Sequence, residues 1–192
     1  VLLICDEVQT GLGRTGRLLA CQHEGVTPDG VTLGKALGGG LIPVSLFLAR
    51  REVMDVFAPG DHGSTFGGNP IAAAVGFAAL DTLVEEQLVE RVATLGPHLL
   101  SRLAGIQSPL VREVRGRGFF AGVELDATRI QASLVVERLL RAGILTKDTH
   151  RNTIRFAPPF VIEKAEIDWA IDRIAEVLEE LCKDAAEPLA AK

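Results

Sequence analysis

Two charged residues, Asp6 and Lys35, each come at the end of a short run that is rich in apolar residues. Asp6 directly follows the run 1–5 (VLLIC), while Lys35 follows 31–34 (VTLG) and precedes three glycines at 38–40. Such runs predict buried strands, and the glycines allow a sharp turn after the second one. Because open α/β sheets bind ligands at the carboxyl ends of parallel strands, both side chains are predicted to lie at a ligand site.

An amine and a carboxylate at two strand ends suit the chemistry of pyridoxal phosphate. A lysine amine captures the cofactor's carbonyl as a Schiff base, and a carboxylate keeps the cofactor's ring nitrogen protonated. This pairing suggests that Lys35 and Asp6 are catalytic residues of a pyridoxal-phosphate enzyme. The plainer alternatives are that Lys35 is a surface lysine, where most lysines are found, and that Asp6 is only a turn residue.

Two stretches that look like nucleotide-binding motifs lack the required surroundings. The segment 11–16 (GLGRTG) matches G-x-G-x-x-G, but residues 6–10 separate it from the strand and no helix is predicted to open at its last glycine. Before Lys35, Asp29 stands where a Walker A motif has its first glycine, and Ala36 replaces the Ser or Thr. A nicotinamide-dependent enzyme remains an alternative that rests on GLGRTG alone.

Five separated segments carry a pattern that extends over the chain from Val1 to about Leu181. They are DEVQTGLGRTG (6–16), LGKALGGGLIPVS (33–45), HGSTFGGNP (62–70), VRGRGFFAGVEL (114–125) and THRNTIRFAPPFVI (149–162). In order and spacing these segments resemble the class III pyridoxal-phosphate aminotransferases. Within that family, the last segment is most similar to the branch that uses ornithine.

The resemblance implies an α/β fold of the pyridoxal-phosphate fold type I class. Residues 1–88 would be the C-terminal part of the large, mostly parallel-sheet domain that binds the cofactor, and 89–192 the small C-terminal α+β domain. An upstream half is then expected, with the rest of the sheet, a glycine-bearing phosphate loop and an aromatic residue that stacks on the cofactor. That half would also carry a glutamate that pairs with the substrate-binding arginine.

The apolar periodicity predicts the elements of both parts. Helices are expected at 18–24, 51–57, 70–86, 87–103 with an interruption at Gly96-Pro97, 130–142 and 163–183. Strands are expected at 1–5, 31–33, 43–49, 111–115, 119–125, 144–147 and 153–156.

The same resemblance assigns cofactor-binding roles to named residues. Lys35 would hold the cofactor and shuttle a proton, Asp6 would bind the ring nitrogen, and Gln9 would hydrogen-bond the ring's phenolic oxygen. Ser64 and Thr65 would bind the phosphate. Because the family takes this threonine from the neighbouring subunit, the resemblance implies a homodimer with a shared active site. The residues alone favour an ordinary capped loop over phosphate binding, since Asn-Pro follows the glycines and such caps are common.

Arg155 is the predicted substrate-binding residue. It lies inside a predicted strand (TIRFA) before two prolines. A planar guanidinium suits bidentate binding of a carboxylate, which every amino-acid substrate carries. Arginines in strands also commonly face solvent, so the residue type alone leaves both interpretations open. The resemblance places the family's carboxylate-binding arginine in this RFAPP context.

The expected reaction is ping-pong transfer of the δ-amino group of ornithine to 2-oxoglutarate, giving glutamate semialdehyde and glutamate. The partners would be small-molecule amino acids and 2-oxo acids. N-acetylornithine and 4-aminobutyrate are alternative donors within the family. An alternative of another class is that the chain is an incomplete, non-catalytic fragment.

Composition excludes several other functions. A net charge of -5 and a pI near 5.4 make nucleic acid and anionic membranes poor partners. No apolar run approaches the ~20 residues of a membrane span. The three cysteines and four histidines lack metal-ligand spacing, so no metal site is predicted. Unpaired cysteines favour a reducing compartment, the cytoplasm, or the mitochondrial matrix in a eukaryotic source.

Overall fold

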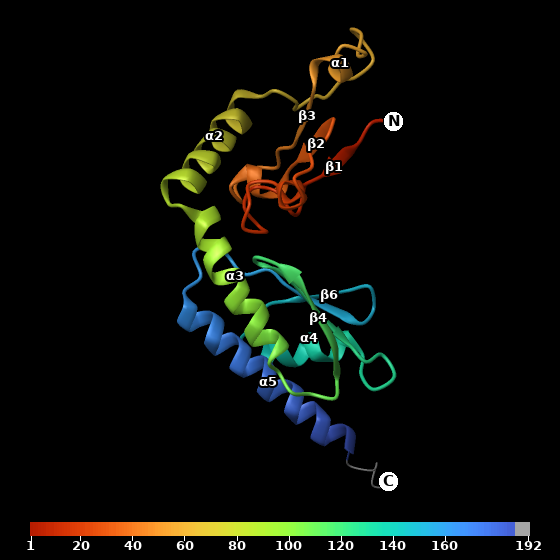
Figure 1. The fold of residues 1–192 in the computed structure, drawn as a ribbon, viewed down its shortest axis with the longest axis vertical. Coiled ribbons are helices and arrows are strands. Elements are labelled where there is room, and N and C mark those ends of the chain that lie inside the picture. Colours follow the sequence, from red (N-terminus) through yellow and green to blue (C-terminus); the bar gives the residue numbers. More distant parts are fainter. Residues whose placement is uncertain (187–192) are drawn as a thin grey trace. The chain divides into compact units, whose positions relative to one another are not determined.

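The computed structural model describes residues 1–186, which form two compact units, Val1–Ala93 and the part from Thr94 onward. Each unit is described by itself, and Figure 1 labels their elements. The predicted boundary between residues 88 and 89 coincides with the start of helix α3 (Leu88–Ala104), and the division between the units lies inside the same helix. The fold is mixed α/β.

The first unit contains a three-stranded sheet in the order β1-β2-β3. Its strands are β1 (Ile4–Asp6), β2 (Gly30–Leu33) and β3 (Leu46–Ala49). β1 and β2 are parallel, and β3 is antiparallel to β2. The strands predicted around Val31 and Leu46 therefore exist, but the described sheet has one parallel and one antiparallel pair.

The first strand differs from the prediction that 1–5 is buried on both faces. Strand β1 begins only at Ile4, and Val1, Leu2, Leu3 and Ile4 are all exposed. In the described chain β1 is an edge strand that pairs with β2 alone, so this run is uncovered. Burial on both faces needs the upstream half that the resemblance implies, and it stays a prediction. An apolar run shows that a segment needs cover, but not which segment covers it.

Four helical elements complete the first unit: η1 (Ala20–Glu24), η2 (Lys35–Gly38), α1 (Arg51–Met54) and α2 (Pro70–Glu85). The Asn69 side chain accepts a hydrogen bond from the Ala72 backbone at 2.8 Å, so α2 starts at the predicted cap. α2 packs against η2 through its small residues. The prediction that α2 is buried on several sides is wrong, because Ile71 and Phe77 are exposed.

The second unit contains an antiparallel four-stranded sheet in the order β4-β5-β7-β6. Its strands are β4 (Val111–Arg117), β5 (Phe120–Leu125), β6 (Lys147–Thr149) and β7 (Thr153–Phe156). The strand predicted at 144–147 is displaced to β6. The Ile144 backbone N–H donates to Leu139 at 2.8 Å and the Ile144 side chain is buried, so this residue closes a helix instead of starting a strand.

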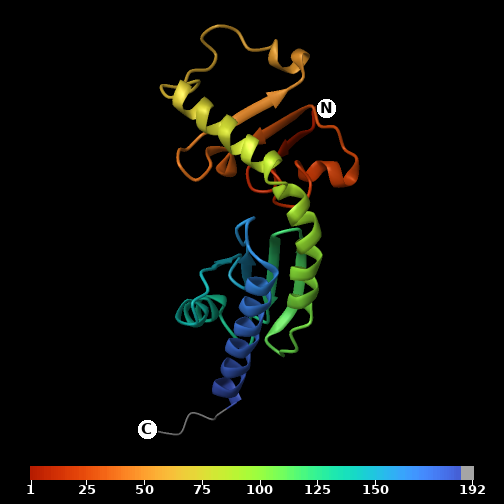
Figure 2. The ribbon, with the colours of Figure 1, turned by 90° about the vertical axis from the view of Figure 1, so that its left-hand side faces the viewer.

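Helices α4 (Ala132–Arg141) and α5 (Lys164–Ala186) join the second half of α3 in this unit, and Figures 1 and 2 show α5 alongside α3. Contrary to the prediction, α3 is not interrupted at Gly96-Pro97. Gly96 packs tightly on the hairpin between β4 and β5, because a Cβ at Gly96 would lie 2.5 Å from Gly118 Cα. This tertiary contact explains a glycine in mid-helix despite its poor helix propensity.

In the part of the chain that the structure describes, no helix is both long enough and apolar enough to span a membrane.

Candidate functional site

Asp6 and Lys35 lie at the same edge of the first sheet. Asp6 is the last residue of β1 and stands opposite Thr32 of the parallel strand β2, which ends two residues before Lys35. Asp6 Oδ1 accepts hydrogen bonds from the Val8 backbone at 3.0 Å and from Thr32 Oγ1 at 3.2 Å. These contacts orient the exposed carboxylate at the carboxyl ends of the parallel pair, where α/β sheets bind ligands.

Lys35 has an unusual backbone conformation. Its φ of 45° lies in the left-handed region that non-glycine residues rarely occupy. The conformation occurs where extended Gly34 passes into the short helix η2, which is capped after Gly38 by Gly39 with a φ of 57°. Side chains held in strained backbone conformations cluster at functional sites, so this feature supports a functional interpretation of Lys35.

The loop after Asp6 carries Gln9 and is anchored by Glu7, a buried acid that the sequence interpretation did not identify. Glu7 accepts hydrogen bonds from Thr10 Oγ1 at 2.5 Å and from the Cys21 backbone at 2.8 Å. Burial raises the pKa of Glu7, but the Thr10 hydroxyl and the N–H groups of Cys21 and Ala20 outweigh it and hold the pKa below its usual value. Glu7 therefore fixes the loop on which Gln9 is exposed.

The glycine motif at 11–16 belongs to this loop and not to a dinucleotide site. Its residues form consecutive turns, and no helix opens at Gly16. A Cβ at Gly16 would lie 2.9 Å from Ala93 Cα, so this glycine allows close packing against α3. The phosphate-binding context that a dinucleotide fingerprint requires is missing.

Ser64 and Thr65 lie in the exposed loop between α1 and α2. Ser64 Oγ accepts a hydrogen bond from the Gly67 backbone at 2.9 Å, and Asn69 Nδ2 donates to the Phe66 carbonyl at 2.8 Å. These bonds stay within the loop and give it the geometry of a capped turn. Phosphate binding by Ser64 and Thr65 stays a prediction.

Arg155 belongs to the second unit and lies half-buried in the middle of β7. It stands opposite Gly122 of β5 and Lys147 of β6, and its carbonyl accepts a hydrogen bond from Thr146 Oγ1 at 2.7 Å. The adjacent Ile154 is buried in the core. Because successive side chains of a strand point to opposite faces, Arg155 lies on the face of the sheet away from the core.

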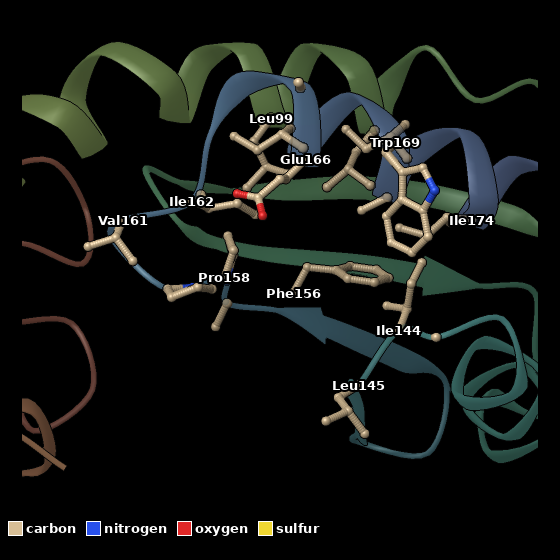
Figure 3. Close-up of a pocket in the computed structure, with 18 residues that line it drawn as sticks. Leu99, Ile144, Leu145, Phe156, Pro158, Val161, Ile162, Glu166, Trp169 and Ile174 are labelled. Carbon is tan, nitrogen blue, oxygen red and sulfur yellow. The ribbon is translucent and has the colours of Figure 1, made fainter.

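A groove of about 870 Å³ also lies in the second unit, and its lining is apolar (Figure 3). The rings of Phe156 and Trp169 line it together with segments of α3, α5 and the loop after β7. Its one charged lining residue is Glu166, whose carboxylate accepts a hydrogen bond from the Glu163 backbone at 2.7 Å at the start of α5. The lining of this groove has no lysine beside a carboxylate, which is the combination that Lys35 and Asp6 provide at the first sheet.

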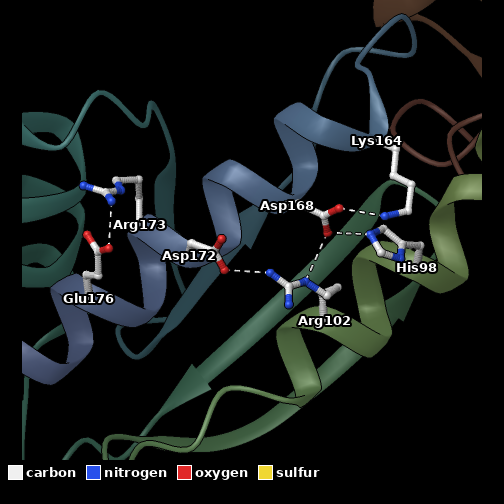
Figure 4. Close-up of polar contacts among 7 residues, drawn as sticks. All are labelled: His98, Arg102, Lys164, Asp168, Asp172, Arg173 and Glu176. Carbon is white, nitrogen blue, oxygen red and sulfur yellow. Dashed lines mark hydrogen bonds and ion pairs between the residues drawn. The ribbon is translucent and has the colours of Figure 1, made fainter.

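A polar cluster joins the second half of α3 to α5 (Figure 4). Asp168 contacts His98 Nε2 at 2.7 Å, Lys164 Nζ at 2.7 Å and Arg102 Nε at 3.1 Å, and Arg102 also pairs with Asp172 at 2.7 Å. Hydrogen bonds from Lys164 and His98 lower the pKa of Asp168 to about 2. We interpret the cluster as a structural contact between two helices.

The candidate metal ligands within residues 1–186 are the side chains of His, Cys, Asp and Glu. The side chains of His, Cys, Asp and Glu in this part of the chain form no group of three or more that could hold an ion.

A family model described as aminotransferase class-III matches residues 1–178. Two curated ornithine aminotransferases are similar over nearly the whole chain. The protein of Geobacillus sp. (strain WCH70) is 54% identical over 177 residues, which cover 92% of this chain and 44% of the relative. The protein of Bacillus subtilis (strain 168) is 53% identical over 178 residues, 93% of this chain and 44% of the relative. The chain thus spans less than half the length of these relatives.

Solved structures of the same kind superpose closely. Plasmodium falciparum ornithine delta-aminotransferase gives a TM-score of 0.93 at 41% identity, over 96% of this chain and 48% of that one. A Toxoplasma gondii ornithine aminotransferase with partial occupancy of PLP at its active site gives a TM-score of 0.91 at 45% identity, over 97% of this chain and 45% of that one. Acetylornithine aminotransferase from Elizabethkingia anophelis gives a TM-score of 0.88 at 44% identity, over 94% of this chain and 46% of that one.

Proposed function

Since the chain belongs to the class-III aminotransferase family, we propose that it is the C-terminal part of an enzyme that transfers the δ-amino group of ornithine to 2-oxoglutarate. The products are glutamate semialdehyde and glutamate. The observation that carries this proposal is the presence of Asp6 and Lys35 at the carboxyl ends of parallel strands, in a chain 54% identical to an ornithine aminotransferase.

The residues at this edge fit pyridoxal phosphate. An exposed carboxylate and an exposed amine lie at the ends of adjacent strands, and the carboxylate is oriented by two hydrogen bonds. Gln9 lies exposed on the loop that follows Asp6. When bound, pyridoxal phosphate supplies an electron sink for the negative charge that develops on the substrate carbon.

Each residue has a distinct task in this proposal. Lys35 holds the cofactor through Nζ, and the same amine then moves the proton at the substrate's amine-bearing carbon. Asp6 keeps a proton at the ring nitrogen, and Gln9 donates a hydrogen bond to the phenolic oxygen. Ser64 and Thr65 bind the phosphate in the site of a neighbouring subunit, so the active enzyme is a homodimer.

The two units correspond in this proposal to two domains. Residues 1–88 form part of the large cofactor-binding domain, whose sheet is mostly parallel in the whole protein. The small α+β domain is assigned to 89–192, of which 187–192 lie outside the described residues. The superposition on chains that are about twice as long supports this division of the fold type I architecture.

Arg155 binds the α-carboxylate of glutamate or 2-oxoglutarate. Its guanidinium is suited to planar, bidentate recognition of a carboxylate. When ornithine is bound through its distal amine, Arg155 needs a different partner, because a desolvated charge without a partner is costly. A glutamate from the upstream half supplies that partner in this proposal.

The test compares kcat/KM for ornithine, N-acetylornithine and 4-aminobutyrate, with 2-oxoglutarate as acceptor, on the full-length protein that contains this chain. Ornithine is expected to give the highest value. A higher value for N-acetylornithine would overturn the substrate assignment while leaving the transaminase assignment intact. N-acetylornithine is the second candidate donor, because acetylornithine aminotransferase from Elizabethkingia anophelis superposes with a TM-score of 0.88.

A further inference from the structure

One row of residues crosses the whole sheet of the second unit and contains three cationic side chains. Arg115 of β4 stands opposite Gly122 of β5, Gly122 opposite Arg155 of β7, and Arg155 opposite Lys147 of β6. Residues directly opposite each other in antiparallel strands project from the same face of the sheet. The row therefore presents two arginines and one lysine on a single face, with a glycine between the arginines.

This face is the one turned away from the apolar core. On β5 and β7, the residues that alternate with the row are Ala121, Val123, Ile154 and Phe156, and all of them are buried. The row is consequently free of the large apolar side chains that fill the opposite face.

Arg115 already has anionic partners. Its Nη1 lies 2.6 Å from Glu124 Oε2 and 3.2 Å from Glu113 Oε2. The hydrogen bond from Arg115 lowers the pKa of Glu124, so this acid stays ionised and compensates the charge of Arg115. Arg115 Nη2 also donates a hydrogen bond to Thr153 Oγ1 at 3.5 Å, so the Arg115 guanidinium has several partners within the sheet.

Lys147 is in a different situation. Its side chain is exposed, and among residues 1–186 the structure shows no ion pair for its amine. The neighbouring Asp148 stands opposite Ile154 and so points to the other face. The hydrogen bond from Thr146 Oγ1 to the Arg155 carbonyl, at 2.7 Å, holds this end of β6 against β7.

Like charges directly opposite each other in a sheet are unfavourable, and the pair of Lys147 and Arg155 is such a case. An anion bound between them would remove the repulsion. Gly122, on the other side of Arg155, is covered by its neighbours: a Cβ there would lie 3.3 Å from Thr153 Cγ2 and 4.0 Å from Arg115 Cγ. The exposed side of Arg155 along the row is therefore the side of Lys147, which stands directly opposite it.

We propose that Lys147 is a second cationic contact for the carboxylate that Arg155 binds, and that it favours dicarboxylic oxo acids over cationic amino donors. This inference rests on the proposed function. 2-Oxoglutarate carries two carboxylates, whereas ornithine carries two amines and one carboxylate. A lysine amine beside the arginine therefore attracts the acceptor and disfavours the donor, which is a selection by charge and not by shape.

The experiment measures the two half-reactions separately on the full-length protein. Lys147→Gln should raise the KM for 2-oxoglutarate about threefold to fivefold, the size expected of one exposed ion pair, with kcat nearly unchanged. The increase should shrink at high salt, because exposed charges are screened. Lys147→Arg should restore the wild-type KM, and the ornithine half-reaction should be unchanged or slightly improved in Lys147→Gln.

Lys183→Gln is the matched control, because it removes the same charge from an exposed site on α5 that pairs with Glu179. It should leave both half-reactions unchanged. Equal losses in both half-reactions of Lys147→Gln, or no change in either, would overturn the inference.

A direct binding measurement separates this inference from the proposed function. Glutarate, a dicarboxylate that cannot react, should bind Lys147→Gln about threefold to fivefold more weakly than wild type in calorimetry. If the wild-type protein transaminates none of the donors, the proposed function fails, yet the glutarate result still decides the role of Lys147. Equal glutarate affinity in both proteins would refute that role whatever the activity.

Discussion

The two units of this chain bury their apolar side chains to different extents. The largest fully buried side chains of the described residues all lie in the second unit, except for Val92. The first unit instead leaves Leu2, Leu41, Phe66 and Phe77 exposed. Yet this first unit carries five of the six predicted site residues, and the second carries only Arg155.

The second unit thus holds most of the buried core, while the first unit holds most of the proposed catalytic and binding residues. In the second unit, three helices and an antiparallel sheet close a core of their own. In the first unit, the proposed catalytic residues Asp6 and Lys35 lie at the ends of β1 and β2. Hydrogen bonds of Glu7 hold the loop after Asp6, and Asn69 bonds within the loop that carries Ser64 and Thr65. Substitutions in the first unit should therefore change catalysis more than folding, and core substitutions in the second unit should do the reverse.

The largest expected effect is on Lys35. Lys35→Arg in the full-length protein should lower kcat about 1000-fold, because guanidinium stays protonated and can neither hold the cofactor nor move a proton. Borohydride fixation of the cofactor followed by peptide mass analysis should place the cofactor mass on Lys35. Lys164→Arg serves as the control and should keep activity, and a cofactor mass found reproducibly on Lys147 or Lys164 would contradict the assignment.

The second effect tests the core of the second unit. Leu139 of α4 is fully buried, and Leu139→Ala should lower the free energy of unfolding by about 3 kcal/mol, through lost burial and the cavity left behind. Its neighbour Leu140 is 54% exposed and supplies a control in the same helix, so Leu140→Ala should cost much less. Urea unfolding of the full-length variants measures both, and equal losses would mean that α4 does not seal this core.

A smaller effect is expected at Arg155. Arg155→Ala should reduce kcat/KM for 2-oxoglutarate at least about 30-fold, since losing one partner of a buried charge pair costs about 2 kcal/mol or more. The ornithine half-reaction should be less affected, because Arg155 does not bind its reacting end. Stopped-flow measurement of each half-reaction checks this, and equal impairment of both would remove the role given to Arg155.

The smallest effect is a pH dependence of the contact between α3 and α5. The pKa of Asp168 is about 2 in the folded protein, below the ordinary 3.8, so between these values the unfolded state binds more protons. The stabilisation from this carboxylate is present above about pH 4 and is lost as the pH falls toward 2. Thermal unfolding across this range should show a steeper decline for wild type than for Asp168→Asn, and parallel declines would contradict it.

The sequence by itself determined the features that depend on neighbours along the chain. Asp6 and Lys35 were placed at strand ends because apolar runs and glycines are local signals, and the start of α2 followed from Asn69 and Pro70. The family could also be recognised, because five motifs occur in a fixed order. In these cases a few consecutive residues carry the whole signal.

Other features were decided only by the tertiary structure. Pro97 lies within a continuous α3, where Gly96 packs on Gly118, and the sequence pattern had predicted an interruption there. The burial of Glu7 depends on Thr10 and on the distant backbone of Cys21. The contacts of Gly96 with Gly118 and of Glu7 with Cys21 join residues far apart in the chain, so no local pattern encodes them.

The row that joins Arg155 to Lys147 shows the same limit most clearly. Which residues face each other depends on strand register, and a shift by one residue would turn every side chain to the opposite face. The local sequence predicts that Arg155 lies in a strand, but it does not predict which residues of the neighbouring strands stand opposite Arg155. Register is set by packing of Val123 and Ile154 into the core, and only the folded chain provides that core.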